Sequence, residues 1–243
     1  MRNHKVLIIA PTSDKKHYCK DKWLSHILSL DYLFYDVLIV DNSEDPEYHK
    51  REFIDKGVRC IHVRPEGNVV DYITASQNVA LQYFRDHPIY DYMFIVESDV
   101  FPPKNAIQYL ISLQKPVVTL PYFINYRDNH PALCWQIMES TYMKRNSMLL
   151  DGLLGFNRFD GGLKEVFACG IGCTMIQREV WDYIKCFRSE TQEREHIEDR
   201  SVFSDTFFYR DLQKEGIPAY MDQSFICDHE WSDWNEHKDF ILN

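Results

Sequence analysis

The chain has 243 residues, of which 45% are hydrophobic and 26% are charged. This composition is typical of a folded globular protein and argues against extensive disorder, and the length suits one α/β domain or two small domains. The formal net charge of −10 makes duplex DNA and anionic membranes poor default partners.

Neither a membrane segment nor an export signal is evident. No apolar run approaches the roughly 20 residues that a membrane helix needs, and the apolar run at 6–10 is shorter than the core of a signal peptide. The seven cysteines are scattered and include no CxxC, which favours reduced thiols in a cytoplasmic protein. Cys169 and Cys173 stay open as a pair for a disulfide or a metal.

The first hundred residues alternate short apolar runs with segments of helical periodicity. Strands are predicted at 6–10, 37–40, 58–63 and 93–96, and helices at 23–30, 47–56 and 69–84. Pro11 is expected to end the first strand, and Gly57 the second helix. This alternation predicts a mostly parallel sheet flanked by helices, in which ligands bind beyond the carboxyl ends of the strands.

The second half of the chain is less regular. Helices are predicted at 103–113, 178–187 and 202–212, and extended segments at 117–120, 167–176 and 217–220. Residues 125–165 read as irregular, with 151–165 a candidate lid, and 189–200 as a charged, solvated face. Because no repeat or linker is evident, a single domain is predicted for residues 1–243.

Two carboxylates follow an apolar strand in the segment YDYMFIVESDVFPPKN, residues 90–105. Side chains at i and i+2 of an extended segment share one side, so Glu97 and Asp99 are expected to face one point. Such a pair repels unless a cation neutralises it, and its hard oxygen ligands suit Mg²⁺ or Mn²⁺. His229, in SFICDHEWSDW, is a candidate third ligand. The alternatives are solvated acids at a strand end and a packing or surface histidine.

Taken in order along the chain, several segments resemble those of GT-A fold glycosyltransferases, especially the family 2-like group. The likeness runs from Val6 to about His229. The residues that carry it are Pro11 and Thr12 after the first strand, Asp41 after the second, Asn78 in ASQNVAL, Glu97 and Asp99 in ESD, Gly170 and Gly172 in CGIGCTMIQREVWD, Asp205 in VFSDTFFYRDLQ, and the late His229.

Three residues depart from the family pattern. Glu97 replaces the first acid of the usual DxD motif, Gln77 stands where an Arg often precedes the Asn, and Ser204 stands where a Glu is common. These departures suggest a divergent member.

The resemblance implies an α/β fold of GT-A type: a mostly parallel, Rossmann-like sheet flanked by helices, with a smaller mixed sheet on the acceptor side. Residues 1–103 would form the nucleotide-sugar-binding half and residues 104–243 the acceptor-binding half. Asp99, His229 and Glu97 would bind Mn²⁺ or Mg²⁺. The residues expected to contact the donor are Pro11, Thr12, Asp41, Asn78, Glu97, Gly170 and Gly172.

The expected function is metal-dependent transfer of a sugar from a nucleotide-diphosphate sugar to an acceptor hydroxyl. Asp205 is predicted to be the base of an inverting reaction, with a helix N-cap as its alternative role. The acceptor is left open among a glycan, a lipid-linked molecule, a protein and a modified nucleobase. The acidic net charge weighs against a modified DNA base.

Two other functions stay open. One is a non-catalytic nucleotide- or sugar-binding module of the same fold. The other is a nucleotidyltransferase, which would usually carry a glycine-rich, basic phosphate loop near the first strand. The segment APTSDKKHYCK has Lys15 and Lys16 but no glycine, which counts against the second.

Overall fold

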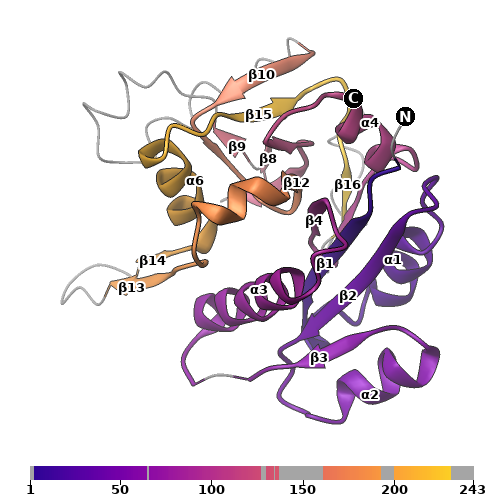
Figure 1. Ribbon diagram of the computed structural model, residues 1–243. Helices are drawn as coiled ribbons and strands as arrows, with labels where there is room; N and C mark the ends of the chain where they lie inside the picture. The colour runs from indigo at the N-terminus through magenta and orange to yellow at the C-terminus, as the bar shows by residue number, and fades with distance from the viewer. Residues whose placement is uncertain are drawn as a thin grey trace.

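The computed structural model describes residues 3–64, 66–126, 130–133, 135–136, 161–192 and 200–230. Its centre is an eight-stranded mixed sheet of order β10-β15-β6-β12-β4-β1-β2-β3 (Figure 1). The strands of this sheet are β1 (Val6–Thr12), β2 (Tyr35–Asp41), β3 (Cys60–His62), β4 (Tyr92–Val96), β6 (Val117–Thr119), β10 (Leu163–Val166), β12 (Cys173–Gln177) and β15 (Ala219–Asp222).

The other described strands form four two-stranded antiparallel sheets. They pair β5 (Val100–Phe101) with β16 (Asp228–His229), β7 (Phe123–Tyr126) with β8 (His130–Leu133), β9 (Trp135–Gln136) with β11 (Ala168–Cys169), and β13 (Glu190–Gln192) with β14 (Arg200–Val202). The first of these is important for the site, because it connects two distant parts of the chain.

The first half of the chain forms a parallel sheet, as predicted. β1 lies between β2 and β4 and is parallel to both, and β3 extends the sheet beyond β2. The helices of this half are α1 (Lys20–Ile27), α2 (Tyr48–Glu52) and α3 (Val69–Asp86). Alternate side chains of β1 enter two separate hydrophobic clusters: Leu7 packs in the cluster that includes Phe84 of α3, and Ile8 in the cluster that includes Trp23 of α1. The sheet is therefore covered on both faces (Figure 1).

The second half of the sheet mixes strand directions. β12 is antiparallel to β4 and β6, β15 is parallel to β6, and β10 is antiparallel to β15. Leu110 of α4 (Ala106–Ser112) joins the cluster on the α1 face, and Phe208 of α6 (Ser204–Lys214) joins the cluster on the α3 face. The predicted α/β fold, with a mostly parallel sheet flanked by helices, is confirmed; the smaller sheets of the described residues are antiparallel and not mixed.

Several predicted elements differ from the structure. β1 continues through Pro11 to Thr12; its pairing with β4 ends at Ile9, so a proline near the end of the strand is tolerated. The segment 125–165, predicted to be irregular, contains strands wherever the structure describes it. Residues 151–160 of the candidate lid and residues 193–199 of the charged face lie outside the described residues.

The helix predicted at 178–187 is reduced to a short 3-10 segment, Arg178–Asp182. The guanidinium of Arg85, on α3, donates hydrogen bonds to the carbonyls of Trp181, Ile184 and Lys185. A side chain therefore satisfies carbonyl groups that a continuing helix would have used.

No helix in the described part of the chain has both the length and the apolar character needed to cross a membrane. The division into a donor-binding half, 1–103, and an acceptor-binding half, 104–243, stays a prediction.

Candidate active site

The site is built at the carboxyl edge of β1, β2 and β4. Thr12, the last residue of β1, pairs in register with Asp41, the last residue of β2. The Thr12 hydroxyl donates a hydrogen bond to the hydroxyl of Ser98 (3.0 Å), in the segment that follows β4. Pro11, Thr12, Asp41 and the ESD motif therefore share one edge of the sheet, as the parallel topology requires.

The ESD motif is a turn and not an extended segment. β4 ends at Val96, and the N–H of Val100 donates to the carbonyl of Glu97 (3.0 Å). The expectation that Glu97 and Asp99 share one side because they lie two apart in a strand is therefore wrong. The two carboxyl groups still lie close enough to interact. Burial, together with the negative charge of Asp99, raises the pKa of Glu97 to about 7.

A short strand pair brings His229 to Asp99. β16 pairs with β5 so that His229 lies opposite Val100, and the N–H of Glu230 donates to the carbonyl of Asp99 (2.9 Å). The Nε2 atom of His229 then lies 3.3 Å from Oδ2 of Asp99, whose side chain is only 3% exposed. These two side chains, distant in sequence, therefore lie side by side, and their binding of a shared metal stays a prediction.

Lys16 also contacts Asp99, through an ion pair to the same oxygen. Burial alone would raise the pKa of Asp99, but the hydrogen bond with His229 and the positive charge of Lys16 outweigh it and lower the pKa. Sequence reasoning did not identify Lys16 as a site residue. The one feature of the sequence that indicates a role for Lys16 is its position just beyond the end of β1, at the edge of the sheet where ligands bind.

Gly172 allows two side chains to lie close to its backbone. Its N–H donates to the hydroxyl of Tyr122 (3.1 Å) and its carbonyl accepts from the N–H of Glu97 (2.9 Å). A Cβ at this position would lie 2.5 Å from the Tyr122 oxygen and 2.6 Å from a Glu97 oxygen. The close approach that Gly172 permits is therefore to Glu97 and Tyr122. Donor contacts from Gly172 and from the buried Gly170 stay predictions.

Tyr122 is a second residue that sequence reasoning missed. Its ring also meets the His229 ring edge-on, with centroids 5.3 Å apart. It follows β6 directly after Pro121, a position with no distinctive motif.

Asp205 lies in the first turn of α6, but it is not the N-cap. The N-cap residue is Phe203, and the carboxylate of Asp205 accepts from the N–H of Thr206 (2.6 Å). Burial raises the pKa of Asp205, and its charge contributes to the raised pKa of Glu97. The two carboxyl groups therefore lie within electrostatic range of each other, which is compatible with the predicted base.

Two of the residues that depart from the family pattern, Gln77 on α3 and Ser204 on α6, contact each other. The buried Ser204 hydroxyl donates to the side-chain oxygen of the buried Gln77 (2.5 Å), so the substitutions form one hydrogen-bonded pair between these helices. The neighbouring Asn78 uses both ends of its amide on the backbone of Phe187 (2.8 and 3.0 Å). Asn78 thus holds α3 to the segment after Asp182, and a direct donor contact from it stays a prediction.

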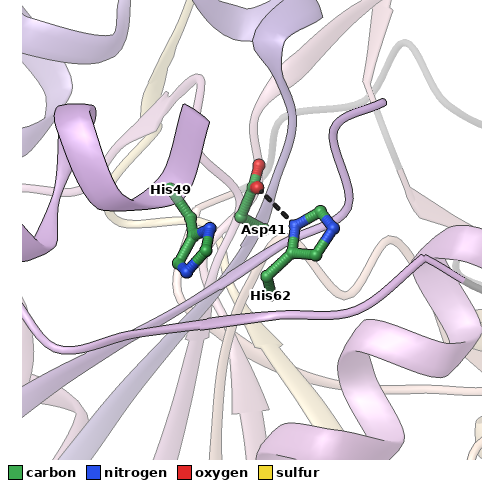
Figure 2. A group of neighbouring side chains, drawn as sticks. All are labelled: Asp41, His49 and His62. Carbon is green, nitrogen blue, oxygen red and sulfur yellow. Dashed lines mark hydrogen bonds and ion pairs between the residues drawn. The ribbon is translucent and has the colours of Figure 1, made fainter. Parts of the chain in front are cut away.

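Asp41 is fully buried at the end of β2. One of its oxygens accepts from the hydroxyl of Ser43 (2.5 Å), and the other lies 2.9 Å from Nδ1 of His62. Figure 2 shows this pair together with His49. Direct contact of the Asp41 carboxylate with a nucleoside stays a prediction.

The residues around Asp99 suit a divalent cation. Two ligands of an octahedral Mg²⁺ ion lie about 3 Å apart, given metal–oxygen bonds of about 2.1 Å, and the Asp99 and His229 ligand atoms are 3.3 Å apart. A carboxylate with an imidazole is a donor set that Mn²⁺ accepts. The ion pair with Lys16 shows that the Asp99 carboxylate attracts positive charge.

The thiols of Cys169 and Cys173, which the sequence left open as a pair, have other partners. The Cys169 thiol donates to the hydroxyl of Tyr209 (2.7 Å), and Cys173 lies against Cys227, with sulfur atoms 3.5 Å apart. Cys169 and Cys173 therefore form neither a disulfide nor a metal pair with each other.

No protein-family model matches the chain, and no curated protein matches it by sequence. Solved structures do match. The mannosyltransferase PcManGT from Pyrobaculum calidifontis, in complex with GDP-Man and Mn²⁺, is 14% identical with a TM-score of 0.55, over 94% of this chain and 57% of that one. TarS 1-349 from S. aureus is 13% identical with a TM-score of 0.55, over 93% of this chain and 60% of that one.

The chain thus spans about three fifths of the length of these two proteins. At such low identity the likeness concerns the fold alone. The chain therefore has an α/β fold similar to those of PcManGT and TarS.

Proposed function

We propose that the protein is a metal-dependent, family 2-like glycosyltransferase that moves a sugar from a nucleotide-diphosphate sugar to an acceptor hydroxyl with inversion. The observation that carries the proposal is the convergence of Asp99 and His229, 3.3 Å apart, at the carboxyl edge of the sheet. In an open α/β sheet this edge is where ligands bind. The glycosyltransferase fold makes a nucleotide sugar the ligand of choice.

Asp99 and His229 would hold Mn²⁺ or Mg²⁺, with Glu97 acting on it directly or through water. The metal, when bound, would neutralise charge on the donor diphosphate. The Lys16 ammonium now pairs with the same Asp99 oxygen. Because it would compete with a cation for that carboxylate, Lys16 is expected to turn to a diphosphate oxygen in the complex. The similar mannosyltransferase, solved with GDP-Man and Mn²⁺, supports this donor class and metal.

The nucleoside would lie over the ends of β1 and β2. Pro11, Thr12 and Asp41 are neighbours there, and Thr12 also contacts the metal-binding turn through Ser98. Asn78, Gly170 and Gly172 complete the proposed donor side.

Asp205 would accept the proton of the acceptor hydroxyl. The acceptor oxygen forms a bond to the anomeric carbon of the sugar, while the bond from that carbon to the diphosphate oxygen breaks. The electron pair leaves with the nucleoside diphosphate, and the proton stays on Asp205. A carboxyl group whose pKa is raised by burial is a stronger base than an exposed aspartate, which favours this role.

The test is a panel of nucleotide sugars, GDP-Man first, with thermal unfolding measured in Mn²⁺, in Mg²⁺ and in EDTA. A ligand that binds the native state raises its melting temperature. We expect one nucleotide class to raise it in the presence of the metal and to be hydrolysed slowly without an acceptor.

Asp99→Asn should abolish both effects, whereas Asp228→Asn, a change at the exposed acid beside His229, should abolish neither. No metal-dependent shift with any nucleotide would contradict the proposal. Binding with no turnover in the presence of any acceptor class would instead identify a non-catalytic binding module.

A further inference from the structure

A second group of metal-ligating side chains lies on the same side of the molecule. Asp41 ends β2, His62 ends β3, and His49 lies in α2 (Figure 2). One ligand atom from each lies within 4.8 Å of the others. Within the described ranges of the chain, no other three His, Cys, Asp or Glu residues bring their ligand atoms this close.

The Asp41 carboxylate is held in place by its neighbours. Its Oδ1 atom accepts from the hydroxyl and the N–H of Ser43 (2.5 and 3.3 Å), which leaves Oδ2 to face His62 at 2.9 Å. Metal-binding carboxylates are oriented by such outer hydrogen bonds. In the described residues no lysine or arginine forms an ion pair with this fully buried carboxylate.

His49 has a buried ring nitrogen without a hydrogen-bond partner in the described part of the chain. Its ring stacks on that of His62, with centroids 5.2 Å apart and planes 23° apart. The Nδ1 atom is buried and has no hydrogen-bond partner among the described residues. A buried polar atom without a partner costs free energy, so a ligand that used the imidazole of His49 would stabilise this arrangement.

The surroundings favour a cation. The arginines nearest to the cluster in sequence are already paired with exposed acids, Arg51 with Asp45 and Arg64 with Glu44. In the described part of the chain, neither guanidinium forms an ion pair with Asp41, whose ion-pair partner there is His62.

We propose that Asp41, His49 and His62 bind a borderline divalent transition metal, with Zn²⁺ as the probe. Two imidazole nitrogens and one carboxylate oxygen suit Zn²⁺, Co²⁺ or Ni²⁺ better than Mg²⁺, which prefers oxygen ligands. Tetrahedral Zn²⁺ with bonds of about 2.0–2.1 Å places its ligand atoms about 3.4 Å apart. The cluster reaches this geometry by side-chain rotation, chiefly of the partly exposed His49.

The bound metal would fasten α2 to the ends of β2 and β3, where β3 is the edge strand of the sheet. With three protein ligands, a fourth position stays open for water or another ligand atom. The site is separate from Asp99 and His229. It shares Asp41 with the proposed nucleoside-binding edge, but metal binding here does not depend on the proposed sugar transfer.

The experiment is a Zn²⁺ titration of the metal-stripped full chain, followed by calorimetry, in an Asp99→Asn background that removes the first site. We expect saturable binding there. His49→Gln or His62→Gln should weaken it at least tenfold, since each removes one of three ligands. His87→Gln is the matched control, because His87 stacks on Tyr83, outside the cluster.

Co²⁺ gives a second, spectroscopic measurement. Bound to the Asp99→Asn chain, it should show the visible absorption of tetrahedral nitrogen and oxygen ligation, which His49→Gln should abolish and excess Mg²⁺ should not. Far-UV circular dichroism of the metal-free variants controls for folding. If His62→Gln does not fold, His49→Gln carries the test, because Nδ1 of His49 makes no hydrogen bond that the substitution would break.

Absence of Zn²⁺ binding in the Asp99→Asn chain would overturn the proposal. Binding that is unchanged by both His49→Gln and His62→Gln would overturn it as well.

Discussion

Two carboxylate–imidazole pairs lie at the carboxyl edge of one sheet and differ in their third neighbour. In the first pair, Asp99 and His229 are 3.3 Å apart, with Lys16 and Glu97 beside them. In the second, Asp41 and His62 are 2.9 Å apart, and the third side chain is another histidine. The first centre is rich in oxygen and charge, which suits a hard cation and a diphosphate. The second is rich in nitrogen, which suits a borderline metal.

The two pairs also differ in how the chain assembles them. Asp41 and His62 are register partners on adjacent parallel strands, so the sheet alone places them together. His229 reaches Asp99 only because the chain returns from the far end to pair β16 with β5. The same pair of side-chain types thus arises once from local sheet register and once from a long-range contact.

The largest expected effect concerns Asp205. If the oxygen-rich centre is where transfer occurs, Asp205→Asn should lower kcat by roughly 10²–10⁴-fold, because it removes the base. The affinity for the nucleotide should stay the same, as judged by metal-dependent thermal stabilisation. Asp211→Asn, on the same helix but in an exposed pair with Arg188, is the control. An unchanged kcat in Asp205→Asn would separate this residue from the chemistry.

Gly172→Ala is expected to damage the first centre and leave the second intact. The added Cβ would meet Glu97 and Tyr122 at well below contact distance, and such overpacking costs about 1–3 kcal/mol in the free energy of unfolding. Urea denaturation measures this cost. Adding Tyr122→Phe, which removes the nearest oxygen, should recover part of the loss. A variant as stable as the parent would contradict the packing described.

The paired acids of the first centre predict a pH dependence in EDTA. The pKa of Glu97 is raised from 4.5 to about 7, so the folded chain binds a proton more tightly than the unfolded chain. The resulting stability is fully present below pH 4.5 and is lost as the pH rises through about 7.

Between pH 5 and 8 the free energy of unfolding should therefore fall by roughly 1–3 kcal/mol because of this group. Glu97→Gln should remove the fall, and Mn²⁺ should reduce it by neutralising the pair. Urea denaturation at several pH values measures it. If the parent and Glu97→Gln lose stability in parallel over this range, the buried acid pair is not its source.

The smallest effect is expected at the rim of the first centre. Lys22 forms an ion pair with Glu230, next to His229, but its side chain is 66% exposed. Exposed pairs contribute about 0–1 kcal/mol, so Lys22→Ala should change stability and nucleotide affinity little. A large loss in either measurement would mean that this ion pair, and not the pairing of β16 with β5, positions His229.

Most of the fold could be predicted from periodicity. β1, β2, β4, α1 and α3 follow from apolar runs and helical spacing in the first hundred residues. The short strands between 123 and 136 could not, because strands of two to four residues are defined by their partners and not by a pattern of their own. The prediction of a helix after Arg178 was wrong because the side chain of Arg85 donates hydrogen bonds to carbonyl groups 96 and 99 residues further along the chain.

The site could be predicted in part. The order of motifs identified Asp99 and His229, which do meet, and the acid of Asp41, which proved to be fully buried beside a histidine. Lys16 was not identified, because its signal, a position just beyond the first strand, is shared with Lys15. Tyr122 was not identified, because nothing in its local sequence distinguishes it from other tyrosines. Their roles depend on contacts that only the assembled sheet creates.

The most direct measurement is a crystal structure of the chain with Mn²⁺ and GDP, with anomalous scattering used to locate the manganese. The account predicts a manganese ion bound by Asp99 and His229, with Lys16 moved from Asp99 to the nucleotide diphosphate. A bound nucleotide with the Lys16–Asp99 ion pair intact, and no manganese beside Asp99, would contradict it.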